Sequence, residues 1–281
     1  MRALTRAPQG IQNWVAWETV AMKRCYAVGL GMVCLYHAAQ GALYNGNGSK
    51  ASGGSVGLGS LNLTDNGTTI SAAFNKGGSA GTGFNDVLVI FIDSKSGGFT
   101  DTSSFSDNGN GLTRAISGFS SGGSRSTAVF ASGFAADYAI ALSFDSGINL
   151  YRLASGGGGS LEALGPLSFS PHDSKTQPTF TFTFTWANIN PEAGNSFRFE
   201  SSYITETGFR SLESFESLTG TAGFGNTITF GNYDSYPIAP IPETTNASLA
   251  IFGMMVLCAG GFRCARRYYK KLNREKTSQE I

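Results

Sequence analysis

Carboxylates are the side chains in this chain with the clearest potential for chemistry. The candidates are Glu200, Glu206, Glu213, Glu216, Asp86 and Asp93. Two carboxyl groups held roughly 5 to 10 Å apart can hydrolyse a glycosidic bond. Such sites usually also offer several tryptophans for sugar stacking, whereas residues 42–246 contain only Trp186. The sequence therefore predicts no enzyme, and a polysaccharide hydrolase using paired carboxylates is the least favoured alternative.

Histidine and cysteine are too scarce between residues 42 and 246 for most nucleophilic or zinc chemistry. His172 is the one histidine there, and its surroundings lack a Gly-x-Ser-x-Gly nucleophile turn. We expect His172 to be a loop residue. The four cysteines lie in two apolar segments near the ends of the chain, namely Cys25, Cys34, Cys258 and Cys264. The region between them can therefore form no disulfide, no Cys–His dyad and no cysteine-type metal site.

Calcium is the one cofactor with candidate ligands. Asp101 and Asp107 lie in the run DTSSFSDNGNG, and residues 93–98 add further oxygen ligands. Calcium prefers such oxygens, but the closing glutamate of an EF-hand loop is absent. Turn formation explains the Asp-Asn-Gly-Asn-Gly sequence equally well. We therefore predict no obligatory cofactor and keep a structural calcium ion as an alternative.

The sequence around these residues predicts strands separated by turns rich in Gly, Ser, Asn and Asp. The predicted strands are residues 57–63, 68–74, 86–93, 126–131, 137–144, 148–153, 180–187, 196–204 and 227–230. A short helix is expected at residues 208–218, where apolar residues recur every three positions. Many strands and few helices predict an all-β domain, an antiparallel β-sandwich or jelly roll.

Two of these strands have patterns that predict their burial. In residues 179–186, Phe180, Phe182 and Phe184 alternate with threonines, which indicates one buried and one exposed face. Residues 87–92 (VLVIFI) are apolar throughout, which favours a central strand covered on both faces.

The N-terminus has the layout of a secretory signal peptide. Met22-Lys-Arg precedes an apolar stretch at residues 25–36, followed by small residues. We place the signal region at residues 1–41, with cleavage after Gly41. Residues 1–21 add nothing to this layout, so Met22 is an alternative start.

The C-terminus carries an uncharged apolar run followed by a basic cluster. Residues 247–262 (ASLAIFGMMVLCAGGF) would span roughly 24 Å as a helix, which is short for a bilayer core of roughly 30 Å. The basic residues flanking the run are Arg263, Arg266, Arg267, Lys270 and Lys271. Positive residues remain on the cytoplasmic side, so we predict a single transmembrane helix with residues 263–281 inside and residues 42–236 outside. A buried core helix beside a charged one is the alternative.

A short motif precedes this run, in a Pro-rich linker at residues 237–246. The motif is Pro242-Glu243-Thr244, and together with the apolar run and the arginine-rich end it resembles the PEP-CTERM sorting domain of Gram-negative bacteria. The resemblance covers about residues 238–270. It implies an exosortase-like processing enzyme as partner, cleavage near the motif, and delivery to the cell envelope or surface. Thr244 stands where the family has a second proline. The same residues also resemble a sortase signal, with Ile241 in place of leucine and Thr245 in place of glycine.

The region between the two targeting segments is acidic. Residues 42–246 hold nine Lys and Arg against 16 Asp and Glu, a formal charge of −7, which argues against a nucleic-acid partner. Residues 85–93, 136–142 and 150–153 resemble β-sandwich modules of the DOMON or carbohydrate-binding type. We therefore predict an exported surface or extracellular-matrix protein with a structural or adhesive role. A carbohydrate-binding module that tethers polysaccharide is the main alternative, with Tyr151, Tyr203 and Tyr233 as candidate stacking residues.

Overall fold

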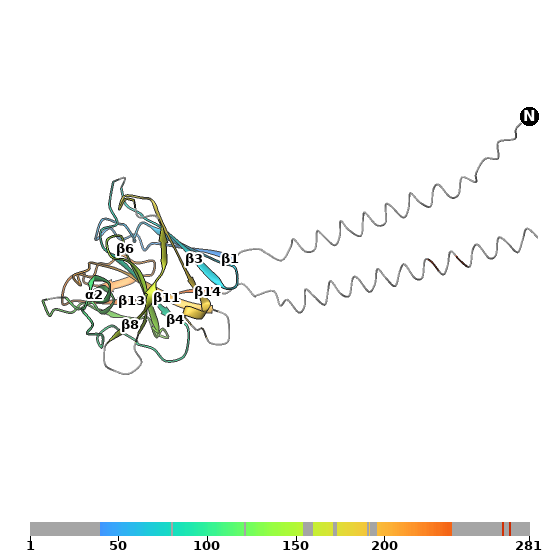
Figure 1. Cartoon of the computed structure of the whole chain (residues 1–281). Helices are drawn as coiled ribbons and strands as arrows, with labels where there is room; N and C mark the ends of the chain where they lie inside the picture. Colours follow the sequence, from blue (N-terminus) through green and yellow to red (C-terminus); the bar gives the residue numbers. More distant parts are fainter. Residues whose placement is uncertain are drawn as a thin grey trace, which may run out of the picture. The chain divides into compact units, whose positions relative to one another are not determined.

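The computed structural model describes the β-strands between residues 40 and 237 and two residues of the C-terminal tail. The described residues are 40–79, 81–120, 122–153, 160–170, 173–189, 191, 196–237, 266 and 270. The domain belongs to a compact unit of residues 37–240, and the segments at the two ends of the chain form a separate unit. The described chain is mostly strand in antiparallel sheets, which confirms the all-β prediction (Figure 1).

All nine predicted strands are present, with ends shifted by at most three residues, and five further strands accompany them. The strands are β1 Gln40–Asn45, β2 Ser60–Asp65, β3 Thr69–Asn75, β4 Val87–Asp93, β5 Thr127–Val129, β6 Tyr138–Ser143, β7 Gly147–Leu153, β8 Leu161–Pro166, β9 Ser168–Ser170, β10 Thr179–Thr185, β11 Ser196–Ile204, β12 Leu218–Gly220, β13 Thr227–Phe230 and β14 Asp234–Pro237. Within the described residues of the domain, the helices are α2 Gly111–Ser117 and α3 Trp186–Ile189.

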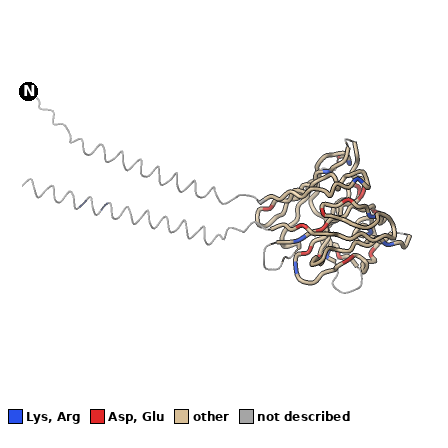
Figure 2. The backbone as a smooth tube through the Cα atoms, turned by 180° about the vertical axis from the view of Figure 1, so that it is seen from behind, with Lys and Arg blue, Asp and Glu red and all other residues tan. Residues whose placement is uncertain are grey.

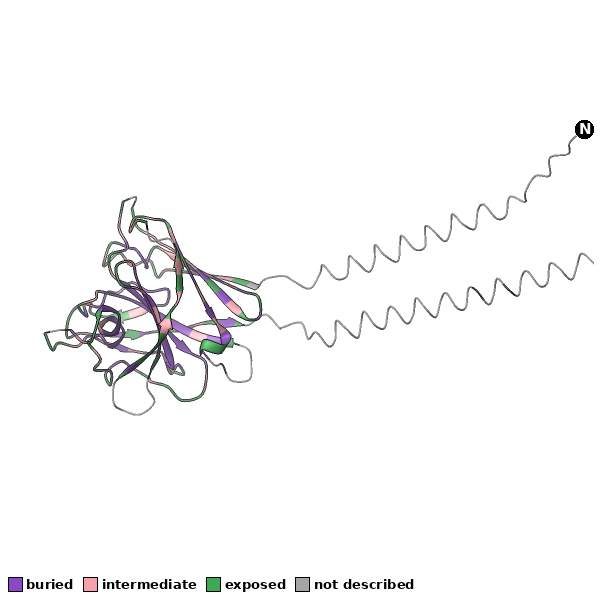
Figure 3. Cartoon of the chain, viewed as in Figure 1, coloured by how far each residue is buried: buried purple, intermediate pink, exposed green. Residues whose placement is uncertain are grey.

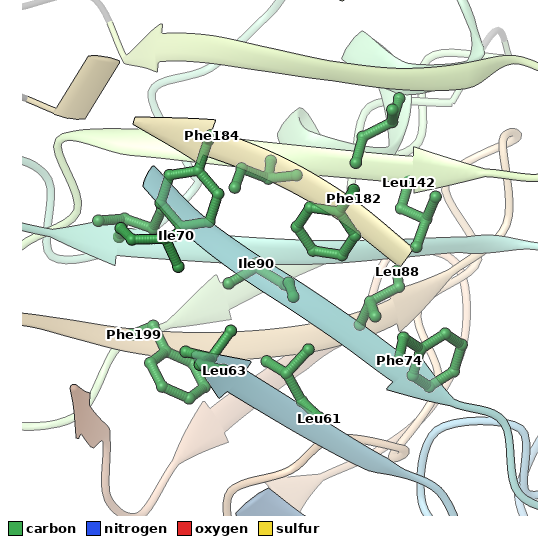
Figure 4. Close-up of a cluster of buried hydrophobic side chains, with 14 of the residues drawn as sticks. Leu61, Leu63, Ile70, Phe74, Leu88, Ile90, Leu142, Phe182, Phe184 and Phe199 are labelled. Atoms are coloured by element: carbon green, nitrogen blue, oxygen red, sulfur yellow. The ribbon is translucent and has the colours of Figure 1, made fainter. Parts of the chain in front are cut away.

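Two sheets face each other around the larger of two hydrophobic cores. A five-stranded sheet has the order β1-β2-β3-β10-β9, and a six-stranded sheet has the order β14-β11-β4-β6-β7-β8. Figure 4 shows Phe182 and Phe184 of β10 among leucine and isoleucine side chains, between strands of the two sheets that cross obliquely. The Phe side chains of β10 are buried and its Thr side chains are not, so the predicted alternation is confirmed. The arrangement is sandwich-like.

A second core lies on the opposite face of the six-stranded sheet. Leu88, Ile90 and Ile92 of β4 enter the first core, and Val87, Val89 and Phe91 enter the second. Helix α2 and a small sheet with the order β12-β13-β5 supply the other side of this second core. The continuous apolar run of residues 87–92 in β4 is thus explained, because every residue of this strand is buried (Figure 3).

The predicted short helix at residues 208–218 was wrong. This segment runs back along β11, where Ser211 donates its backbone N–H to the Tyr203 carbonyl and Tyr203 donates to the Glu213 carbonyl. Strand β14 pairs only with residues 196–199 of β11 and leaves the rest of that edge open. Unpaired backbone groups at a buried edge are costly, so the segment supplies partners for them in an extended form. Apolar residues at three-residue spacing predict a helix, but this segment instead forms backbone hydrogen bonds with the open edge of β11.

Two tyrosines connect the last strand of the domain, β14, to β1 and β2 of the other sheet. Tyr44 of β1 donates to the Ser235 carbonyl of β14 at 2.8 Å, and Tyr236 of β14 donates to Asp65 Oδ2 at 2.7 Å. Tyr236 is fully buried and Asp65 is 4 % exposed, so the second bond is shielded from water.

Removing the Tyr236 hydroxyl should therefore loosen the join between the two sheets. We expect Tyr236→Phe to lower the free energy of unfolding by about 1–3 kcal/mol, the range for a buried hydrogen bond to a charged group. Urea denaturation measures this. Tyr44→Phe is the matched control and should cost less, because its hydrogen bond is exposed. Equal effects for the two variants would contradict the assignment.

Candidate functional site

The sorting motif predicted from the sequence lies outside the described residues. Pro242, Glu243 and Thr244 fall there, as do residues 247–262 and the basic residues Arg263, Arg267 and Lys271. Arg266 and Lys270 are described, and both are helical and exposed. Within the described parts of the chain, no helix is both long and apolar enough to cross a membrane. His172 also lies outside the described residues.

Asp101 and Asp107, the calcium candidates, are engaged in local turns. Asp101 Oδ1 accepts the backbone N–H and the hydroxyl of Ser103, the first at 2.7 Å. Asp107 Oδ1 accepts the Gly109 N–H at 3.0 Å. Such bonds two residues ahead are the usual turn chemistry of aspartate. In the described ranges, no group of three or more His, Cys, Asp or Glu residues is placed to hold a metal ion.

Glu213 is the most heavily bonded of the candidate carboxylates. Its Oε1 accepts the backbone N–H groups of Ser52 at 2.6 Å and Gly54 at 2.8 Å. Its Oε2 accepts those of Val56 at 3.0 Å and Gly57 at 3.3 Å. The carboxylate is fully buried, and it organises the glycine-rich loop between β1 and β2. Gly57 is required there, since a Cβ at this position would lie 2.2 Å from the Ser49 carbonyl oxygen.

Glu216 and Glu200 are buried with fewer partners. Glu216 Oε2 accepts bonds from the Ser201 N–H at 2.8 Å and from the Ser201 and Ser214 hydroxyls. Glu200 Oε1 accepts the Ala131 N–H at 2.9 Å. The other oxygen of each has no hydrogen-bond partner among the described residues. Burial is the main cause that raises the pKa of Glu200 to about 9 and that of Glu216 to about 7.

The remaining carboxylate candidates are Glu206, Asp93 and Asp86; burial first, and then the charges of Glu213 and Glu206, raise the pKa of Asp86. Glu206 Oε1 accepts the Ser143 hydroxyl at 2.9 Å and the Ser146 hydroxyl at 2.5 Å. Asp93 pairs with Arg198 at 2.6 Å and also accepts the Ala135 N–H. Burial also raises the pKa of Asp93. The hydrogen bonds of these carboxylates connect loops to strands, which is a structural use of charge.

Arg210 is a buried cation that the sequence analysis did not single out. Its Nη1 donates to the Ser202 hydroxyl at 2.8 Å, whereas Nε and Nη2 have no hydrogen-bond partner in the described chain. Burial lowers its pKa to about 9. The sequence around Arg210 does not indicate that this side chain is buried. Its burial depends on the way the segment after β11 packs along the edge of that strand.

Two of the three candidate stacking tyrosines are unavailable to a sugar. Tyr151 and Tyr203 are 2 % and 1 % exposed and belong to the two cores, so that prediction was wrong for both. Their strands place them inward on the pleat. Tyr233 is 36 % exposed, and the guanidinium of Arg198 lies over its ring, with the central carbon 5.1 Å from the ring centroid.

An open hollow of about 390 Å³ lies near the ends of β6, β7 and β8. Its lining includes Lys95, Tyr138, Arg152 and Asn188. Both cations have partners, since Lys95 lies over the Tyr138 ring and Arg152 forms an ion pair with Glu162. No carboxylate lines it. The hollow is therefore a weak candidate for a ligand site.

The outer face of the five-stranded sheet is the most regular surface of the domain. We call the outward residues of β2, β3, β9 and β10 the hydroxyl face; none of them is charged, and ten of the 13 are Ser or Thr. They are Ser60, Asn62, Thr64, Thr69, Ser71, Ala73, Asn75, Ser168, Ser170, Thr179, Thr181, Thr183 and Thr185. Figure 2 shows how sparsely charged residues are distributed along the domain.

Strand register aligns these residues into rows. Thr64 pairs with Ser71, Ser71 with Thr183, and Thr183 with Ser168, which makes one continuous row of four hydroxyls across four strands. None of these four hydroxyls has a hydrogen-bond partner among the described residues, in contrast to Thr179 and Thr181. Neighbouring strands are about 4.8 Å apart, so the row presents donors and acceptors at a regular spacing.

Together, the fold and this surface define a class of protein: an all-β, sandwich-like domain with several buried carboxylates and an uncharged polar face. Comparison of the chain with models of protein families, with curated proteins and with solved structures found no significant match.

Proposed function

We propose that this chain is an exported bacterial cell-surface or extracellular-matrix protein with a structural or adhesive role. One observation carries the proposal, namely the order of segments along the chain. A signal-peptide pattern is followed by an acidic β domain, a Pro-Glu motif, an apolar run and a basic cluster. Each segment alone is weakly specific, but this order matches what a surface sorting signal needs.

The limits of the folded domain support this reading. Strand β1 begins at Gln40, within two residues of the expected signal cleavage site. Strand β14 ends at Pro237, five residues before Pro242. The folded domain therefore fills the interval between the two targeting segments, so both could be removed with little loss of folded structure.

The proposed partners follow from the same tail. Residues 247–262 hold the precursor in the membrane, with the basic residues on the cytoplasmic side. An exosortase-like enzyme then acts near Pro242-Glu243-Thr244. The proposal includes no catalytic role for the β domain, which is supported by the structural hydrogen bonds of its candidate carboxylates.

A carbohydrate-binding module is the second candidate, and the hydroxyl face is the observation that favours it. Ser and Thr hydroxyls both donate and accept, as sugar hydroxyls do. This candidate differs from the first only in what the domain does once it reaches the surface.

The sorting proposal predicts both ends of the mature protein. We expect mass spectrometry of protein from fractionated native cells to show a start near Ala42 and loss of everything beyond about Thr244. Thr244→Pro, which restores the family motif, should increase the processed fraction. Glu243→Ala should decrease it, because the motif would lose its acidic residue.

Other outcomes of this measurement have distinct meanings. An intact, membrane-bound C-terminus would indicate a plain single-pass anchor and would contradict processing. An unprocessed N-terminus in the cytoplasmic fraction would contradict export altogether.

A further inference from the structure

We propose that the hydroxyl face binds an uncharged polysaccharide. This inference rests on the proposed export, since it names the partner that the domain would meet at the surface. Its starting observation is the row Thr64, Ser71, Thr183 and Ser168, in which four hydroxyls without partners in the described chain lie in cross-strand register.

The lack of charged residues among the 13 residues of the hydroxyl face favours a neutral partner. None of its 13 outward residues is charged, although residues 42–246 as a whole carry a formal charge of −7. An anionic polymer would be repelled by the domain and would find no cation on this face, and a cationic partner would find no carboxylate. A chain of neutral sugars needs only hydroxyl and amide partners, which this face supplies.

The geometry favours a repetitive ligand of extended shape. Rows of small polar side chains repeat across strands about 4.8 Å apart, a spacing comparable with the width of a sugar ring. The methyl groups of Thr181 and Thr183 add apolar contacts between the hydroxyls. The solvent-exposed aromatics of the described chain are Phe224 and Tyr233, and neither belongs to this face. Binding would therefore depend on hydrogen bonds and shape rather than on stacking.

A second copy of the chain is the other conceivable occupant, and the size of the face argues against it. Even with β1 included, seven-residue strands in a five-stranded sheet cover roughly 23 by 19 Å, or about 440 Å². A specific protein interface buries about 800 Å² on each partner. A face this small binds weakly by itself, but many anchored copies on one polymer gain avidity.

Retention on insoluble polysaccharides tests the proposal. The full chain, purified in detergent, is incubated with curdlan and cellulose as neutral probes and with calcium alginate beads as an acidic one. We expect retention on at least one neutral polymer and none on alginate. The double variant T181K/T183K places two charges at the centre of the face and should reduce retention at least tenfold. The control T227K/T229K makes the same double change on the exposed side of β13 and should bind like the wild type.

Each other result has a stated meaning. No retention on either neutral polymer, or equal retention of T181K/T183K and wild type, would overturn the proposal. A dimer seen by sedimentation that T181K/T183K dissolves would overturn it in favour of a copy-to-copy interface. If T181K/T183K loses its β-sheet circular dichroism, T181A/T183A replaces it, with a smaller expected loss. None of these outcomes depends on processing of the termini, so failure here leaves the export proposal intact.

Discussion

We expect Glu213→Gln to lower the free energy of unfolding by about 2–4 kcal/mol, because an amide group would face backbone donors that the carboxylate now accepts. Four N–H groups of residues 52–57 converge on Glu213, and three of them belong to buried residues. A glutamine retains one acceptor oxygen but turns an NH₂ group toward the other two donors. Glu213→Ala would leave all four unsatisfied and should cost more.

Urea denaturation of the full chain measures this effect, and limited proteolysis locates it. The loop between β1 and β2 should become the first site of cleavage, since Glu213 is the group that organises it. Glu162→Gln is the matched control, because Glu162 forms an exposed ion pair with Arg152. Exposed pairs contribute at most about 1 kcal/mol. If the two glutamine variants unfold at the same urea concentration, Glu213 does not have the role assigned to it.

The second large effect is a loss of stability as the pH rises from about 5 to about 9. Burial raises the folded-state pKa of Glu216 to about 7 and that of Glu200 to about 9, above the ordinary value of 4.5. A carboxyl group whose folded pKa is raised contributes its full stability below the ordinary pKa. That contribution is lost as the pH rises through the folded pKa, at about 1.4 kcal/mol per pH unit for each group.

The other carboxylates with shifted pKa values act in the same direction. Burial also raises the pKa of Asp86, Asp93, Asp137 and Asp234. The pKa of Arg210 is lowered to about 9, so its titration does not offset the trend below that pH. The domain should therefore resist denaturation best under mildly acidic conditions.

Glu216→Gln isolates one of these contributions. The amide keeps an oxygen for Ser201 and Ser214 but cannot ionise, so the variant should be less sensitive to pH than the wild type. Relative to the wild type, we expect it to gain about 2–3 kcal/mol between pH 5 and pH 8, because the wild type loses about 1.4 kcal/mol per pH unit until the pH reaches the folded pKa of Glu216, about 7. Urea midpoints at the two pH values measure the gain. Parallel curves for variant and wild type would show that Glu216 keeps an ordinary pKa.

Much of the fold could be predicted from local patterns. The alternation in Thr179–Thr185 and the continuous apolar run of Val87–Asp93 each indicated how many faces of a strand are covered, because side chains alternate across a strand. Strands β1, β8, β9, β12 and β14 were missed, because their sequences contain few β-branched residues.

The candidate sites were less predictable. The local sequence around an acidic residue does not show whether its side chain is exposed to solvent or buried in a core. Glu213 became the centre of a loop more than 150 residues away, and Tyr203 became a core residue, because of where the segment after β11 lies. The alternating threonines of β10 indicated part of the hydroxyl face from the sequence alone. The rows that extend it to β2, β3 and β9 required the strand order.

The sequence by itself determined the strand pattern, the acidity of the β domain and the segments that predict export, since each depends on residue type and local order. Only the tertiary structure decided which carboxylates are buried, which arginine lies in the core and which polar residues share a face. Burial and cross-strand register arise from contacts between distant segments. Residues 210–213 lie along β11 for the same reason, because the backbone groups at its open edge required partners.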